Sequence, residues 1–410
     1  MATIFRNTYL LDPVQGLEGR GDVLVENGKI VGILQDELAI GKIVPILVPQ
    51  WGTEIIDLEG AFLSPGWIDL HTHTFSSIGD FCLPADDVGI RSGVTTIADA
   101  GTSGILTFDA FRRTVIDTAK TRTYAFINPS LLYIATSDFI AHRLEIIANP
   151  RNQDLERAAA VIEANRDVIV GLKVHPAFHQ GETRSPIMDA ARSLADRFSL
   201  PLMVNLGRFV PHEVLLSPEG LLALLKPGDI VTHCFQPHDG LFDGNGNLLP
   251  GARAAIDRGV LLDVGYSKNH FSIELARTAL AHEILPNTLS TDLSRLSPDP
   301  AGSLAAVITR FVSLGMSLGQ AIERVTIHPA RILSKATELG CLKPGMLADF
   351  TIFNWVDEAT NLEDGKGTSL PVSQMLKVQG VCRSGEYIKI ERSPFDPKLT
   401  SDDSQTPALV

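Results

Sequence analysis

The sequence predicts an α/β fold, namely a (β/α)₈ TIM barrel with a small β-sandwich domain built from both termini. Runs of consecutive apolar and β-branched residues recur through the middle of the chain, which is typical of strands buried on both faces of a parallel sheet. Segments with helical periodicity, such as 155–165 and 186–198, lie between these runs, and this alternation favours parallel β/α units. Both ends of the chain instead show short alternating strands separated by turn residues.

The two ends predict antiparallel strands. Asp22–Glu26 and Lys29–Ile33 alternate as strands do, and Asn27-Gly28 joins them, a dipeptide typical of two-residue hairpin turns. Short strands with turn residues between them return at 349–353 and 380–383. Because both ends of the chain show this pattern of short strands and turns and the middle does not, we expect the two ends to assemble into one domain.

The domain boundaries follow from these patterns. We expect residues 1–60 and 342–392 to form the small β-sandwich domain, 61–341 to form the barrel, and 393–410 to be a flexible tail. A chain of 410 residues is long enough for a barrel of about 250 residues and a smaller domain. The eight apolar runs expected as barrel strands are 67–70, 94–98, 124–128, 168–174, 200–205, 229–234, 260–264 and 288–292.

Composition narrows the classes of partner. The net charge of −13 argues against nucleic acid and anionic membranes, which both reward a basic surface. The four cysteines lie far apart without a CxxC pair, so we expect neither a zinc knuckle nor a disulfide framework but reduced thiols in the cytoplasm. The start of the chain predicts no signal peptide, and no apolar run reaches the roughly 18 residues of a membrane helix. We expect a small-molecule substrate and a homo-oligomer.

Histidines close the first predicted barrel strand. His71 and His73 stand two residues apart after 67–70, and residues at that spacing face the same way on a strand. Chemistry in a (β/α)₈ barrel gathers at the carboxyl ends of its strands. The pair is therefore a candidate metal site, although an isolated HxH pair would be a weak signal.

Three further strand ends carry candidate ligands. Lys173 ends the fourth predicted strand, where its charge would be desolvated unless it is paired with a carboxylate or modified. His233 ends the sixth strand and Asp292 ends the eighth. Each alone could be structural, but side chains at several strand ends of one barrel converge on one point. Histidine and carboxylate ligands suit zinc, with manganese or iron left open.

Together these segments resemble the amidohydrolase superfamily, most nearly its deacetylase-like members and then dihydroorotase and D-aminoacylase. The resemblance covers most of the chain. It is carried by Pro65–His73, Ser92–Gly101, Asp167–Val174, Leu225–Phe235, Leu261–Gly265, Leu289–Leu293 and, on the return to the small domain, Leu342–Phe353.

The resemblance implies a binuclear metal site. His71, His73 and Asp292 would hold one Zn²⁺, His233 would hold a second, and Lys173 would bridge the two after carboxylation by CO₂. A hydroxide activated by bound metal would attack the substrate carbonyl, since metal lowers the pKa of water. Asp292 would be the catalytic residue that takes up the proton and passes it to the leaving group.

The chain departs from the superfamily pattern in places around this pocket. Asn205 stands where binuclear members normally have the histidine of strand five, and an amide oxygen is a weak zinc ligand. His175 could substitute as a ligand, bind substrate, or be a hydrogen-bonded loop residue. His179 and His212 are more distant candidates, and Ser294 stands where relatives often have a histidine. Whether one or two metals bind is left open.

Three functions are therefore weighed. The first is metal-dependent hydrolysis of an amide, cyclic amide or ester bond of a small molecule, with C–N bonds other than peptide bonds favoured. The second is hydrolytic deamination with a single metal held by His71, His73 and Asp292. The third, from another class, is a catalytically weak barrel that serves as a binding or assembly module; Asn205 supports it and the other five candidate ligands argue against it.

Overall fold

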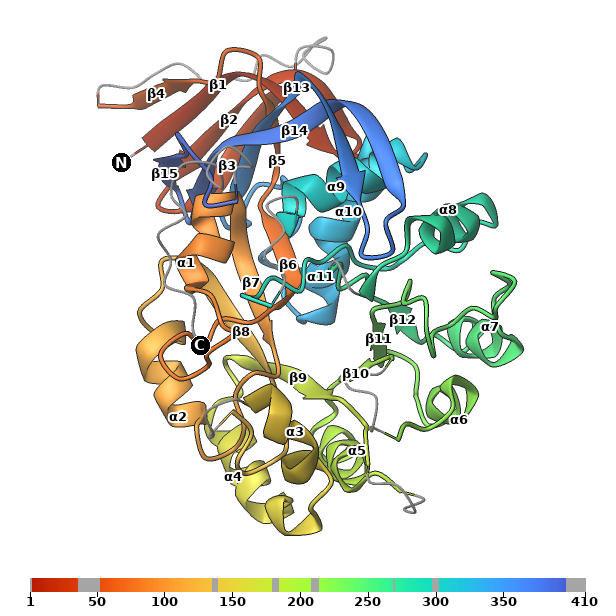
Figure 1. Cartoon of the computed structure of the whole chain (residues 1–410). Coiled ribbons are helices and arrows are strands. Elements are labelled where there is room, and N and C mark those ends of the chain that lie inside the picture. Colours follow the sequence, from red (N-terminus) through yellow and green to blue (C-terminus); the bar gives the residue numbers. More distant parts are fainter. Residues whose placement is uncertain are drawn as a thin grey trace, which may run out of the picture.

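The computed structural model describes residues 2–35, 52–134, 139–178, 184–207, 214–267, 270–296 and 302–395, with the side chains of 139–142 excepted. Two sheets organise these residues (Figure 1). A parallel sheet with helices around it forms the larger body, and a mixed sheet built from both ends of the chain lies beside it at the top of Figure 1.

Seven of the eight predicted barrel strands form one parallel sheet, in the order β12-β11-β10-β9-β8-β7-β6. Sequential strands are neighbours, as expected for repeated β/α units. The strands are β6 (Trp67–Thr72), β7 (Val94–Ala100), β8 (Arg122–Ile127), β9 (Ile169–Val174), β10 (Leu202–Asn205), β11 (Ile230–Thr232) and β12 (Leu261–Leu262).

The eighth predicted strand, at 288–292, is not formed as a strand. Single parallel bridges instead join Thr288 to Asp263 at one edge of the sheet and Leu293 to Thr72 at the other. The hydroxyl of Thr288 bonds the carboxylate of Asp263 at 2.6 Å, and Asp292 has a left-handed backbone with φ of 54°. Backbone bonds accompany these bridges: the N–H of Val264 donates to Thr288 at 3.1 Å, and the N–H of Asp292 donates to His71 at 2.8 Å. The segment therefore joins both sheet edges through its backbone without forming a regular strand.

Helices follow most of the strands, and the predicted helices at 155–165 and 186–198 are both present. Side chains at their first turns explain several starts: Asp154, Ser272, Ser303 and Ser317 each accept a hydrogen bond from a backbone N–H three residues on, as N-caps do. The helices are α1 (Ala85–Val88), α2 (Phe108–Phe111), α3 (Phe139–Ile147), α4 (Leu155–Ala164), α5 (Pro186–Phe198), α6 (Pro218–Ala223), α7 (Pro250–Asp257), α8 (Ile273–Ala281), α9 (Leu304–Ser313), α10 (Leu318–Val325) and α11 (Ile327–Ile332).

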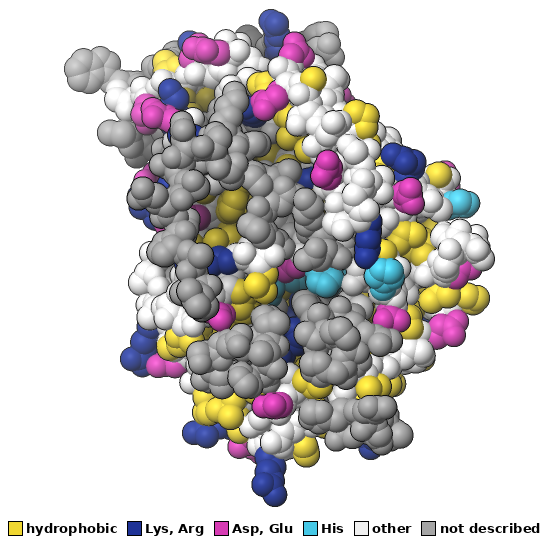
Figure 2. Space-filling view, viewed as in Figure 1, with side chains coloured by type: hydrophobic (Ala, Val, Ile, Leu, Met, Phe, Trp, Pro, Cys, Tyr) yellow, Lys and Arg dark blue, Asp and Glu magenta, His cyan; other side chains and the backbone are white. Residues whose placement is uncertain are grey.

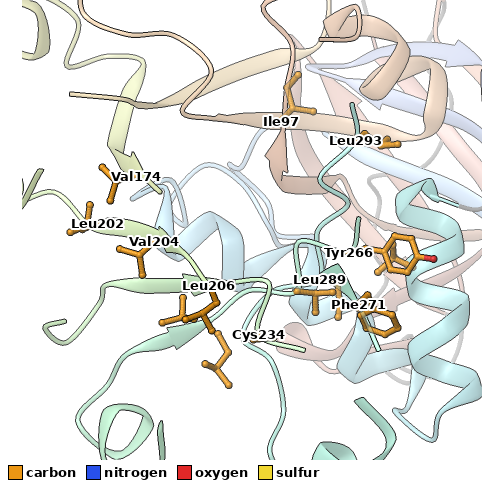
Figure 3. Close-up of a cluster of buried hydrophobic side chains, with 14 of the residues drawn as sticks. Ile97, Val174, Leu202, Val204, Leu206, Cys234, Tyr266, Phe271, Leu289 and Leu293 are labelled. Carbon is orange, nitrogen blue, oxygen red and sulfur yellow. The ribbon is translucent and has the colours of Figure 1, made fainter. Parts of the chain in front are cut away.

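The barrel strands divide their side chains between two apolar clusters. On β10, Leu202 and Val204 join the large cluster beneath the helices, and Figure 3 shows them beside Val174 of β9. Met203, between them, joins a separate cluster that includes Ala330 of α11. This alternation is the period of two that a strand imposes, and it places Asn205, two residues after Met203, on the inner side.

The terminal strands form one mixed sheet, in the order β15-β14-β13-β5-β1-β2-β3 with β4 beside β1. They are β1 (Ala2–Asp12), β2 (Leu17–Glu26), β3 (Lys29–Gln35), β4 (Glu54–Asp57), β5 (Phe62–Pro65), β13 (Phe350–Glu363), β14 (Ser369–Arg383) and β15 (Glu386–Lys389). The predicted hairpin turn is present, with positive φ at both Asn27 and Gly28.

This sheet corrects the expected β-sandwich, because its strands are connected in one sheet rather than two. Phe5 of β1 nevertheless contacts Tyr387 of β15 with ring centroids 5.9 Å apart, although three strands separate them in the sheet order. The sheet is therefore curled, with one apolar core inside the curl. β5 pairs with both β1 and β13, so the sheet continues past the boundary expected at residue 60.

The hairpin of β13 and β14 links the two bodies. The predicted strands at 349–353 and 380–383 are only its base, since the strands reach Glu363 and begin again at Ser369. Its far end meets the loop after β12, where the Tyr266 hydroxyl donates to the carbonyl of Glu363 at 3.2 Å. At its base, buried Asp349 forms an ion pair with Arg122 of β8.

Two expectations from composition can be compared with the structure. Cys82, Cys234, Cys341 and Cys382 are all buried and form no disulfide. In the part of the chain that is described, every helix is too short or too polar to cross a bilayer. Of the tail expected at 393–410, residues 396–410 lie outside the described part.

Candidate metal centre

The predicted ligands line one cavity of about 280 Å³ at the carboxyl ends of the strands. They come from far apart in the chain: His71 from β6, Lys173 from β9, and His233 and Asp292 from the segments after β11 and β12. Figure 2 shows histidine side chains near the middle of one face, below the hairpin of β13 and β14, whereas the rings of His71 and His233 are buried beneath the surface. Strand topology has thus brought the separate candidates to one place.

His71 presents Nε2 to the cavity because Nδ1 carries the ring proton. Thr232 Oγ1 donates its own proton to Asp263 at 2.7 Å, so it must accept from His71 Nδ1, which lies 2.8 Å away. Burial and the charge of Lys173 also hold the pKa of His71 well below its usual value. The ring is therefore neutral with a lone pair on Nε2, as metal binding requires.

The other two histidines also have a hydrogen-bond partner at Nδ1, and for His233 that partner fixes the tautomer. His233 Nδ1 lies 2.9 Å from the carbonyl oxygen of Gly265, which can only accept, so Nε2 carries the lone pair. His73 Nδ1 lies 2.8 Å from Thr102 Oγ1. Bonds from Nδ1 to a carbonyl or hydroxyl are the usual way in which metal-binding histidines are oriented.

Asp292 lies close to the Nε2 atoms of His71 and His73. Its Oδ1 lies 3.3 Å from His71 Nε2 and 3.1 Å from His73 Nε2. Burial raises the pKa of Asp292, whereas protonated His71 and His73 would lower it to about 2, and a cation bound at the same place would act in the same direction. An ionised oxygen close to an imidazole lone pair is unfavourable unless a cation sits between them. The ligand atoms of His71, His233 and Asp292 all lie within 4.8 Å of one another, so the donor set fits a divalent ion.

Lys173 lies beside the same group. Its Nζ is 3.2 Å from His71 Nε2, its side chain is buried, and burial lowers the pKa of the amine to about 8. Among the described residues it forms no ion pair with a carboxylate, which was the alternative to modification. A lowered pKa increases the fraction of neutral amine at neutral pH, and this is the form that reacts with CO₂.

Comparison with known proteins identifies the family. A deacetylase of Agrobacterium fabrum is 32% identical over 344 residues, covering 83% of this chain and 82% of the relative. The chain belongs to the amidohydrolase superfamily. A deacetylase of Enterococcus faecalis is 30% identical over 367 residues, covering 87% of this chain and 96% of the relative.

Solved structures agree with this family. An adenine deaminase matches with a TM-score of 0.80 and 25% identity, covering 94% of this amidohydrolase and 99% of the deaminase. A dihydroorotase matches with a TM-score of 0.77 and 26% identity, covering 95% of this chain and 99% of the dihydroorotase. No protein-family model matches the chain. The resemblance seen in the sequence is confirmed.

The positions that depart from the superfamily pattern lie in the same cavity. Asn205, His175 and Ser294 all line it. Asn205 Oδ1 is buried and has no hydrogen-bond partner among the described residues. Asn205 stands at the position where the superfamily pattern leads us to expect the strand-five histidine. His179 and His212 lie outside the described residues.

Some residues of the amidohydrolase centre were not found from the sequence. Asp263 lies within Leu261–Gly265, whose resemblance was noted but given no role. Its buried carboxylate accepts from Thr232, Thr288 and Ser290 at 2.6 to 2.7 Å, and it lies 3.4 Å from His71 Nδ1. His270 and Arg143 also line the cavity; they lie in a loop and on a helix, away from the strand ends where the sequence predicts ligands.

Replacing Asp263 with asparagine is expected to weaken metal binding by about 10- to 100-fold. The asparagine amide cannot accept from all of the hydroxyls that converge on this carboxylate, so Thr232 and His71 lose their fixed orientation. Isothermal titration of the metal-depleted protein with Zn²⁺ would measure the change. Asp257→Asn, on the exposed end of α7, is the matched control and should bind as wild type; an unchanged affinity in Asp263→Asn would remove Asp263 from the centre.

Proposed function

We propose that this amidohydrolase hydrolyses a C–N bond, in an amide or cyclic amide, of a small molecule that carries an anionic group. The observation that carries this proposal is the convergence of neutral imidazoles from β6 and β11 on the ionised Asp292, within 4.8 Å, at the carboxyl end of the sheet. The relatives named deacetylase and dihydroorotase support the class of bond. In this reading, residues 288–293 take the place of the eighth barrel strand.

The residues would divide the work as follows. His71, His73 and Asp292 hold one divalent ion, and His233 with carboxylated Lys173 holds a second. Zinc is the first choice, because nitrogen and carboxylate ligands in a buried site suit it, with manganese or iron as alternatives. A bound ion supplies a nucleophilic water near neutral pH and polarises the scissile carbonyl.

Carboxylation of Lys173 is supported by its surroundings. The ammonium first loses one proton; the neutral amine then attacks CO₂, an N–C bond forms, and a second proton is released, so that a cation would become an anionic oxygen ligand. Asp292, ionised at neutral pH, is placed to take a proton from the attacking water and pass it to the leaving nitrogen. The four buried free thiols support a reducing compartment, and we place the enzyme in the cytoplasm.

The anionic group of the substrate is proposed from the charges around the cavity. Arg143 of α3 is 2% exposed and lines the cavity. Among the described lining residues, Asp292 is the one carboxylate, and it already faces two histidines. A cavity with this balance, in a protein of net charge −13, favours an anion over a cation. Arg143 suits a carboxylate through its planar, two-pronged guanidinium.

Replacing Arg143 with methionine is expected to raise KM for a carboxylate-bearing substrate by about 10- to 100-fold, the loss of one charged hydrogen-bonding group. KM for the corresponding primary amide should change little. Steady-state kinetics on such an acid and amide pair, with N-acyl amino acids and hydantoin-type rings as the starting set, gives the comparison. Equal losses on both would contradict the anion assignment and leave the hydrolase assignment standing.

Deamination is the second candidate, favoured by the similarity to an adenine deaminase and by Asn205, which suits a site with one metal. The same screen separates the two by product. Release of ammonia from an amino-substituted ring would favour deamination, while release of an acid and an amine would favour amide hydrolysis. A chain that binds metal and turns over neither class would instead point to the binding or assembly module.

A further inference from the structure

We propose that His270 supplies the ligand for the second metal that Asn205 does not provide. The second ion would then be held by His233, His270 and carboxylated Lys173. This inference rests on the metal centre of the proposed function, and it assigns a role to a residue in the loop after β12. It also predicts that two metals bind, although strand five lacks its histidine.

Four imidazoles form a continuous row across the cavity. Ring centroids are 5.5 Å apart between His73 and His71, 5.2 Å between His71 and His233, and 4.5 Å between His233 and His270. The first two rings face Asp292, where one ion would sit. His270 therefore packs against His233, the proposed ligand of the second ion, and it is 8% exposed.

A contact between two loops explains how His270 reaches this position. Gln236 Nε2 lies 3.0 Å from His270 Nδ1, and it passes close to Gly207, two residues after Asn205. A Cβ at residue 207 would be 2.3 Å from Gln236 Nε2, so the glycine is needed for Gln236 to enter. The end of strand five thus carries Asn205 in place of a histidine ligand, and Gly207 leaves space for Gln236, which contacts His270.

Gln236 can also give His270 the tautomer that binds metal. Its Oε1 is buried and has no partner in the described part of the chain. A half-turn of the amide exchanges the oxygen for the NH₂ group opposite Nδ1. The oxygen then accepts from Nδ1, which places the ring proton there and makes Nε2 the coordinating nitrogen. This is the arrangement that His71 and His233 already have.

The loop that carries His270 is fixed on two sides. The His270 backbone N–H donates to Ser267 at 2.8 Å, and that of Ser267 donates to Thr291, next to Asp292, at 3.1 Å. Beyond His270, the N–H of Ile273 donates to the buried carboxylate of Asp364, at the end of the long hairpin, at 3.0 Å. A ligand held by such contacts keeps its position with little loss of entropy on binding.

The test is the number of metal ions per chain, measured by elemental analysis. The full chain is stripped, reconstituted with Zn²⁺ and bicarbonate, and dialysed. We expect two ions for wild type, one for His270→Ala, and two again for the double variant Asn205→His/His270→Ala, in which strand five regains its ligand. His175→Ala should keep two, and the exposed His282→Ala is the control for loss of any histidine.

A second variant covers the case in which His270→Ala does not fold. Gln236→Leu leaves His270 in place but removes its orienting partner, and should weaken the second ion by about 10- to 100-fold while sparing the first. The inference is overturned if His270→Ala retains two ions, if His175→Ala loses one instead, or if wild type binds only one. A wild-type chain with one ion and hydrolase activity would contradict the role of His270 and leave the proposed function intact. A chain with neither bound metal nor turnover would contradict both the role of His270 and the proposed function.

Discussion

Replacing Asp292 with asparagine is expected to lower kcat by about 10²- to 10⁴-fold, the usual contribution of a general acid–base group. The carboxylate lies 3.1 Å from His73 Nε2 and 3.3 Å from His71 Nε2, and its pKa of about 2 keeps it ionised at neutral pH. Asparagine has the same shape but cannot accept and release a proton. Steady-state kinetics on the best substrate from the screen would measure the loss.

The control for this variant separates proton transfer from loss of the ion. Metal content of Asp292→Asn is measured beside its activity, because an amide oxygen can still occupy one coordination position. Reduced kcat with metal still bound assigns the loss to proton transfer. Activity within twofold of wild type would exclude Asp292 from the reaction and with it the proposed mechanism.

Lys173→Ala and Lys173→Arg are both expected to lose at least about 100-fold in kcat/KM, because a metal contributes several kcal/mol to the transition state. Alanine would remove the proposed carbamate ligand altogether. Arginine keeps a cation at the same place but cannot form a carbamate, since it stays protonated. The pair therefore tests modification against the simpler role of a buried charge.

Two measurements complete the test of Lys173. Short carboxylic acids such as acetate or propionate should restore part of the activity of Lys173→Ala, because they offer the same oxygen ligand to the metals. Wild type supplied with ¹³C-labelled bicarbonate should show a carbamate signal by NMR that Lys173→Ala lacks. Full activity in Lys173→Arg, or no carbamate in the active enzyme, would contradict carboxylation.

The sequence predicted seven of the barrel strands and the candidate ligands that share the cavity, because both have local signals. Apolar runs such as Ile169–Val174 mark buried parallel strands, and the HxH pair at His71 stands out at the end of one. The eighth strand was not formed as predicted: residues 288–293 make only isolated bridges to the two sheet edges, and Asp292 has a left-handed backbone. The single curled terminal sheet depends on contacts such as that between Phe5 and Tyr387, which no local pattern reveals.

Residues at the edge of the site were harder to predict for a related reason. His233 and Asp292 reach the cavity through left-handed backbone, with φ of 59° and 54°, so strand periodicity alone does not orient them. His270 follows the end of β12 by several residues, and Arg143 stands on α3. Their positions come from loop and helix packing across the molecule, which becomes visible only in three dimensions.

The central claim is that His71, His73 and Asp292 hold a catalytic metal, and metal-dependent activity tests it most directly. Wild type and the double variant His71→Asn/His73→Asn are dialysed against chelator and then titrated with Zn²⁺, with bound metal and hydrolysis recorded together. Wild type should regain activity in proportion to bound metal, and the double variant should regain neither. Full hydrolysis by chelated wild type, or unchanged metal binding by the double variant, would contradict the account.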